Sequence, residues 1–89
     1  MATHHIKATG KVQGVFYRAT AKKMAVSADL VGWVKNTLDG DVEIMVTGED
    51  SKLQAFETWC KMGPPQAVVE KVVVKAVAEV AFNDFKILR

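Results

Sequence analysis

The segment Gly10-Lys11-Val12-Gln13-Gly14-Val15-Phe16-Tyr17-Arg18 separates two different hydrophobic periodicities. Before it, residues 4–10 alternate between the two faces expected of a half-buried strand. After it, apolar residues recur at the spacing of one helical stripe, namely Tyr17, Ala21, Met24, Ala25 and Ala28. The two glycines of the segment therefore mark a loop that leads from a strand directly into a helix.

Outward from this loop, the chain continues with elements of both kinds. Asp39-Gly40 is a hairpin signal between two strands, and Gly63-Pro64-Pro65 ends a second helix because proline disrupts helical bonding. Ser51 and Gln54 fit a capping box at the start of that helix. The predicted elements are strands at 4–10, 30–36, 41–47 and 68–77, a short strand around 85–87, and helices at 17–28 and from 50 or 51 to 62.

This order of elements is the β-α-β-β-α-β plan of ferredoxin-like folds. Both helices must cover one face of the sheet, because each has an apolar stripe to bury. We therefore predict an α+β fold, a ferredoxin-like α/β sandwich whose antiparallel sheet of four to five strands carries two helices on one face. With 89 residues, the chain has room for a single domain, residues 1–89.

The composition excludes several classes of protein. A chain with 49% hydrophobic and 25% charged residues is not disordered, and its formal net charge of +2 offers no argument for a nucleic-acid partner. Cys60 is the only cysteine, so no internal disulfide is possible. The sequence contains no signal peptide and no apolar run that could span a membrane. We expect a cytoplasmic monomer that binds neither nucleic acid nor membrane.

The motifs of several catalytic classes are missing. Neither a G-x-S-x-G elbow nor a G-x-x-x-x-G-K-[ST] loop occurs in the sequence. His4 and His5, with a single cysteine, do not make a zinc site, and we expect the two histidines to lie at a fraying end. We therefore expect no metal and no cofactor.

The loop between the first strand and the first helix has the features of an anion site. Successive backbone N–H groups in such a loop can form a nest, and the helix N-terminus adds about half a positive charge. The helix dipole disfavours Arg18 at that position unless an anion binds between them. Phosphate fits, because a guanidinium can grip two of its oxygens. The alternative is that the glycines only form a turn and that Arg18 is solvated.

A second candidate lies in Gly32-Trp33-Val34-Lys35-Asn36, just before the predicted hairpin. Asn36 carries a neutral amide that can position a water molecule or a substrate oxygen. Alternatively, its side chain bonds its own backbone, as asparagine before a turn commonly does. We expect Trp33 to belong to the core rather than to stack on a ligand.

Together these segments resemble the signatures of the acylphosphatases. Residues 10–18 look like the first signature of that family, and residues 32–36 look like the second. Further matches stand at the expected offsets, at Gly40, Val42, Gly48 and Gly63-Pro64-Pro65-Gln66-Ala67. The likeness covers nearly the whole chain. It departs from the family at Tyr17, where phenylalanine is usual, and at Asp29, where glycine is usual.

The resemblance implies an enzyme that hydrolyses acyl phosphates to a carboxylate and inorganic phosphate without a metal, as a hydrolase acting on acid anhydrides. The family's catalytic arginine falls on Arg18 and its catalytic asparagine on Asn36. The implied phosphate-binding loop, whose backbone N–H groups act together with Arg18, consists of Val12, Gln13, Gly14, Val15, Phe16 and Tyr17. The expected partner is a small acyl phosphate, with inorganic phosphate as product and inhibitor.

Two other functions remain open. Ferredoxin-like domains also serve as non-catalytic RNA-binding or regulatory modules, because a fold does not determine a function. Domains similar to acylphosphatases also occur within a larger carbamoyl-transferring protein of hydrogenase maturation. The chain starts at Met1 and ends within its last predicted strand, from which we expect a free-standing enzyme.

Overall fold

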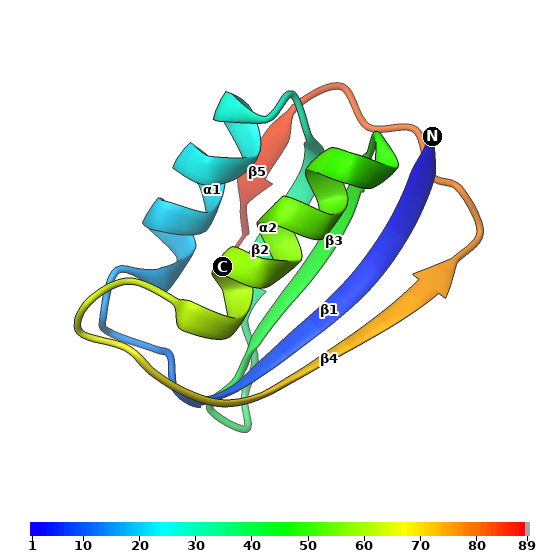
Figure 1. The fold of residues 1–89 in the computed structure, drawn as a ribbon. Coiled ribbons are helices and arrows are strands. Elements are labelled where there is room, and N and C mark those ends of the chain that lie inside the picture. The colour runs from blue at the N-terminus through cyan, green and yellow to red at the C-terminus, as the bar shows by residue number, and fades with distance from the viewer. Residues whose placement is uncertain (89) are drawn as a thin grey trace.

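The computed structural model of the chain describes residues 1–88. Within these residues it contains five strands and two helices in the predicted order (Figure 1). The strands are β1 (Ala2–Lys11), β2 (Val31–Asn36), β3 (Val42–Gly48), β4 (Val68–Val77) and β5 (Phe85–Ile87). The helices are α1 (Tyr17–Ser27) and α2 (Asp50–Met62). The prediction of a ferredoxin-like α+β fold is confirmed.

The five strands form one sheet in the order β4-β1-β3-β2-β5. β1 pairs with β3 and β4, and β2 pairs with β3, all antiparallel as predicted. β5 instead runs parallel to β2, so the sheet is mixed rather than wholly antiparallel. The cause is the last crossover. β4 runs antiparallel to β2, so it ends at the end of the sheet where β2 begins. The chain then crosses the sheet at this end, and β5 starts beside the start of β2 and runs in the same direction.

Both helices lie on one face of the sheet, as predicted (Figure 1). Sheet residues that point toward the helices, such as Ile6, Val34 and Ile44, are completely buried. An aromatic cluster with ring centroids 5.2–6.4 Å apart joins the helices to β5, and consists of Tyr17, Phe56, Trp59 and Phe85. This cluster fixes the start of α1, and with it the end of the glycine loop, against the core.

The end of α1 explains an aspartate that departs from the family pattern. Asp29 has a left-handed backbone with φ 57°. The N–H group of Leu30 donates to the carbonyl of Ala25, and that of Asp29 donates to the carbonyl of Val26. These two bonds form a Schellman motif, in which aspartate occupies the position where glycine is commoner.

The capping box predicted for α2 does not form. The helix is preceded by Glu49, which has an extended backbone and makes no side-chain cap. Because the helix already begins at Asp50, Ser51 lies inside its first turn, and the Ser51 hydroxyl donates to the Glu49 carboxylate at 3.3 Å.

Three residues lie elsewhere than predicted. His4 and His5 belong to β1 rather than to a fraying end, with His4 against Glu57 of α2 and His5 against Glu43 on the other face. Trp33 does not enter the core. Side chains alternate along β2, so the burial of Val34 beneath the helices turns Trp33 to the uncovered face of the sheet.

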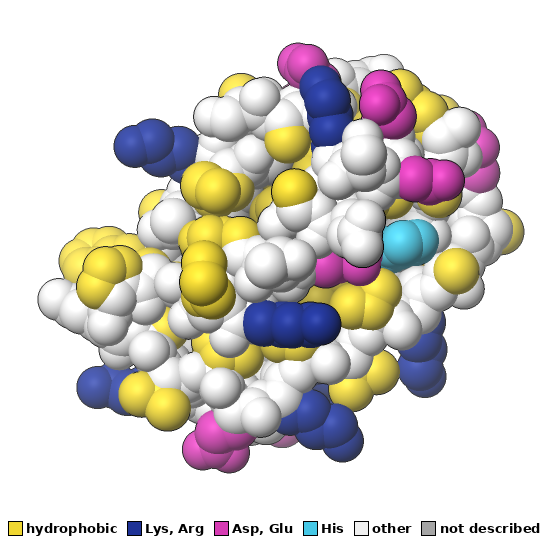
Figure 2. All heavy atoms as spheres, in the orientation of Figure 1, with side chains coloured by type: hydrophobic (Ala, Val, Ile, Leu, Met, Phe, Trp, Pro, Cys, Tyr) yellow, Lys and Arg dark blue, Asp and Glu magenta, His cyan; other side chains and the backbone are white. Residues whose placement is uncertain are grey.

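The face of the molecule that carries the helices has no large area of single charge. Figure 2 shows basic side chains spread over this face and sharing it with acidic ones. In the part of the chain that the structure describes, no helix is long and apolar enough to cross a membrane.

Candidate active site

The loop of residues 12–16 joins β1 to α1 and is anchored by two buried valines. Val12 and Val15 are only 1% and 4% exposed, so their side chains hold the loop against the core. Gly14 and Phe16 have left-handed backbones, with φ values of 73° and 67°. Left-handed residues within a turn are typical of anion-binding nests. The loop thus contains left-handed residues of the kind that anion-binding nests use.

The backbone N–H groups of residues 13–16 have no partners within the described part of the chain. None of the N–H groups of residues 13–16 donates to a backbone carbonyl within residues 1–88. The first turn of α1 adds further N–H groups that no helical carbonyl accepts. That turn contains no acidic residue, so no side chain neutralises the positive end of the helix dipole.

Gly10 explains how the chain leaves the sheet to form the loop. The register between β1 and β4 shifts between Thr9 and Gly10, which is a bulge. At Gly10 the backbone has φ 128°, and a Cβ atom would lie 2.3 Å from the carbonyl oxygen of Val68. Only glycine is compatible with this approach of the two strands.

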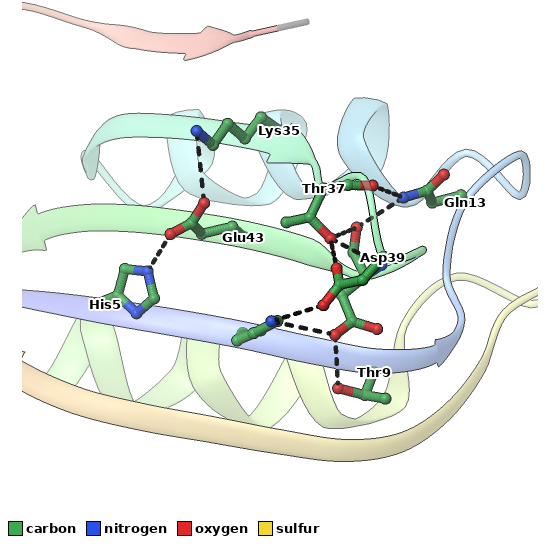
Figure 3. A network of polar contacts seen from close by, with 9 residues as sticks. His5, Thr9, Gln13, Lys35, Thr37, Asp39 and Glu43 are labelled. Carbon is green, nitrogen blue, oxygen red and sulfur yellow. Dashed lines mark hydrogen bonds and ion pairs between the residues drawn. The ribbon is translucent and has the colours of Figure 1, made fainter.

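A cavity of about 290 Å³ opens beside the loop. Its lining residues are Val12, Gly14, Phe16, Tyr17, Arg18, Ala19, Asn36 and Ile87. Both predicted catalytic residues and four residues of the predicted phosphate loop therefore meet at one place. Val15 faces the core, and the side chain of Gln13 points toward the β2–β3 hairpin (Figure 3).

Sequence reasoning missed Ile87 as part of the cavity wall. Ile87 reaches the cavity because β5 lies parallel to β2, with Ile87 opposite Val34. No local signal in the sequence specifies this pairing across the edge of the sheet.

Arg18 lies in the first turn of α1 and is partly buried. Its Nη1 donates to the carbonyl oxygen of Leu88 at 3.3 Å. Among residues 1–88, no carboxylate forms an ion pair with its guanidinium. The contact with Leu88 orients the side chain and leaves other guanidinium donors for a ligand, since the group carries five N–H donors.

Asn36 ends β2 at the opposite wall of the cavity. Its Oδ1 is buried and accepts no hydrogen bond within residues 1–88. The turn bonding that asparagine could have made is supplied by the next residue, because the Thr37 hydroxyl accepts from the Asp41 N–H group at 3.0 Å. The amide of Asn36 is therefore not committed to the hairpin, and a buried acceptor without a partner is costly unless a ligand or water binds it.

Tyr17 differs from the family pattern without placing its hydroxyl in the cavity. The hydroxyl donates to the carbonyl oxygen of Cys60 at 2.8 Å, near the C-terminal end of α2. Burial raises the pKa of this phenol, so it stays protonated as the donor. The extra oxygen of Tyr17 therefore joins the two helices.

The chain has clear similarity to known proteins. The acylphosphatase family model matches residues 4–87. An acylphosphatase of Marinobacter nauticus is 45% identical over 83 residues, which covers 92% of this chain and 90% of that protein. A solved acylphosphatase of Coxiella burnetii superposes with a TM-score of 0.95 at 38% identity, over 98% of this chain and 92% of that one.

A longer protein also contains a similar domain. The structure of full-length HypF in its phosphate- and nucleotide-bound form superposes with a TM-score of 0.88 at 30% identity. That match covers 99% of this chain but 12% of HypF.

Proposed function

Since the chain belongs to the acylphosphatase family and is an enzyme of that type, we propose that its reaction takes place in the cavity between residues 12–16, Arg18 and Asn36. One observation carries this proposal. Asn36, whose Oδ1 is buried without a partner among residues 1–88, lines the same cavity as a guanidinium that no carboxylate of those residues neutralises.

In this proposal, the phosphate end of an acyl phosphate binds at the loop. The backbone N–H groups of residues 13–17 and the guanidinium of Arg18 hold the phosphoryl oxygens. Charge on these oxygens is balanced by the helix N-terminus and by Arg18, both of which lack a charged partner of their own among residues 1–88. Phosphoryl transfer requires mainly positioning and charge stabilisation, so a loop of backbone N–H groups with one guanidinium can be sufficient for catalysis.

Asn36 orients the attacking water, which donates a hydrogen bond to its Oδ1. The water oxygen forms a bond to phosphorus while the bond between phosphorus and the acyl oxygen breaks. The carboxylate leaves with the electron pair of that bond, and the proton of the water passes to solvent. Because a carboxylate is a weak base, the leaving group needs no dedicated general acid, and none of the proposed roles falls to a histidine or a carboxylate.

We further propose that residues 1–89 act as one domain and as a cytoplasmic monomer, with inorganic phosphate as product and inhibitor. Nucleic acid is not a partner in this proposal. On the uncovered sheet face, Lys7 pairs with Asp39 and Asp41, and Lys35 pairs with Glu43, so these lysines are already neutralised (Figure 3).

Initial rates on benzoyl phosphate test the roles of the site. Arg18→Ala removes both the counter-charge and the donors, and we expect a loss of at least about 10²–10³ in kcat/KM. Arg18→Lys keeps the positive charge but loses the bidentate donor, and we expect its rate to lie between those of Arg18→Ala and the parent. Lys22→Ala, on the same helix and exposed, is the matched control. An Arg18→Ala variant as fast as the parent would refute the assignment.

Two additions make the assay more specific. We expect a chelator to leave the rate unchanged and inorganic phosphate to compete with the substrate. Rates that depend on an added metal would contradict the proposal.

The likeness to HypF suggests a second candidate, in which the chain works as the equivalent of one domain of a larger protein. The coverage of 90% of the Marinobacter nauticus relative favours the first candidate. The ratio of kcat/KM values for benzoyl and carbamoyl phosphate separates the two, because a strong preference for carbamoyl phosphate would favour the second.

A further inference from the structure

The side chain of Gln13 connects the phosphate loop to the hairpin that follows Asn36. Its Nε2 donates to the carbonyl oxygen of Thr37 at 2.8 Å and to that of Asp41 at 2.9 Å (Figure 3). Both N–H bonds of one amide are thus used, each on a backbone acceptor. Gln13 is also partly buried, so these bonds are shielded from competing water.

The two acceptors lie on either side of the hairpin neck. Thr37 follows Asn36 directly, and its N–H group donates to the Asp41 carbonyl at 2.9 Å. The hairpin is closed by this bond and by those of the Thr37 hydroxyl, without any contribution from Gln13. Gln13 therefore adds nothing that the hairpin needs for its own closure.

What Gln13 adds is a link between two segments. Among residues 1–88, its two bonds are the only hydrogen bonds between residues 12–16 and residues 36–41. One of these segments would hold the phosphoryl group, and the other would hold the attacking water. Their separation decides whether the water lies in line with the leaving carboxylate.

We propose that the Gln13 side chain is a positioning residue, which holds the phosphate loop and Asn36 at the separation that in-line attack requires. This role rests on the proposed function and is distinct from that of the Gln13 backbone N–H group in the loop. A misplacement of about 1 Å between reacting groups can cost on the order of 10²-fold in rate. Loss of the link should therefore lower kcat more than it weakens phosphate binding.

Gln13→Met is the main variant, because it keeps the length of the side chain and removes both donors. We expect kcat on benzoyl phosphate to fall about 10- to 100-fold, while the inhibition constant of inorganic phosphate changes less than about threefold. Gln13→Asn keeps the amide but shortens its reach, and we expect a similar loss. Gln66→Met, at an exposed glutamine, is the control for the substitution itself. Circular dichroism identifies any variant that does not fold.

A double-mutant cycle with Asn36→Ala separates positioning from a merely structural role. Once the amide of Asn36 is absent, the separation that Gln13 maintains no longer matters, and Gln13→Met should cost less than about threefold in that background. An equal loss in both backgrounds would overturn the proposal, and so would a phosphate inhibition constant that rises by the same factor as kcat falls. If Asn36→Ala alone keeps the parent rate, it is the proposed function that fails.

Discussion

Replacement of Asn36 by alanine should separate activity from stability. Within residues 1–88, no hydrogen bond of the fold uses the Asn36 side chain, and its Oδ1 is buried without a partner. A buried acceptor of this kind costs about 1–3 kcal/mol when empty. Binding a water satisfies it but costs up to about 2 kcal/mol in lost water entropy. Against either cost stands a small loss of side-chain packing and strand propensity, of up to about 1 kcal/mol.

The expected balance ranges from a loss of at most about 1 kcal/mol to a gain of up to about 3 kcal/mol in the free energy of unfolding. The rate should fall in either case. Loss of one preorganised polar group in a reacting site costs about 10²–10³ in kcat, which is about 2.7–4 kcal/mol of transition-state stabilisation. Phosphate inhibition should be retained, because the loop and Arg18 are unchanged.

Urea unfolding and initial rates on benzoyl phosphate measure the two effects separately. A shift of the urea midpoint at constant slope reports the change in the free energy of unfolding. Thr37→Ala is the contrasting variant one residue along the chain. It removes a hydroxyl that accepts from Asp41 and donates to Asp39, so it should cost about 1–2 kcal/mol of stability. An Asn36→Ala variant that loses more than about 1 kcal/mol, or that keeps its rate, would refute the reasoning.

Three further substitutions test the fold. Asp29→Gly removes the cost of a left-handed aspartate and should raise the free energy of unfolding, measured with urea, by about 0.5–1 kcal/mol. A lower free energy of unfolding would contradict the inference that the Asp29 backbone is strained. Tyr17→Phe leaves the Cys60 carbonyl without its donor and should lower Tm by about 5–10 °C, whereas an unchanged Tm would mean that the bond contributes nothing. The hydrogen bond from His5 holds the pKa of Glu43 below its usual 4.5, so this contact stabilises the fold above that pH and is lost as the pH falls through the lowered pKa. Glu43→Gln should therefore lower Tm by a few degrees near pH 6 and by less near pH 3, and equal shifts at both values would argue against it.

The sequence was sufficient where a local signal had a single structural meaning. The change of periodicity at the glycine loop predicted the transition from strand to helix. Asp39-Gly40 predicted the hairpin, and the structure has its strands on both sides. Arg18 could be singled out because its charge conflicts with a position at a helix N-terminus, whereas Asn36 was assigned a role only through the resemblance of residues 32–36 to the second acylphosphatase signature. The structure brings these two residues to one cavity.

What the sequence could not predict depends on pairing between distant segments. The direction of β5 follows from the end of the sheet at which the chain crosses after β4. This direction in turn places Ile87 in the wall of the cavity. Trp33 was misplaced because its hydrophobicity was weighed without the alternation of β2, which reserves the covered face for Val34. The bonds of the Gln13 side chain were invisible for the same reason, since their acceptors are backbone carbonyls 24 and 28 residues away.

The hydrogen bond between Arg18 and Leu88 joins residues 70 positions apart in the chain, which bears on the order in which the parts of the molecule unfold. Closing so long a loop is entropically costly, and the strand that delivers Leu88 has three residues at an edge of the sheet. Short edge elements open locally at a lower free energy than the core. We therefore expect β5 to detach first, which would remove one wall of the cavity and the support of the Arg18 guanidinium while β1, β3 and both helices stay folded. Because the proposed site depends on this part of the fold, we expect heat or denaturant to abolish activity before the circular dichroism spectrum changes.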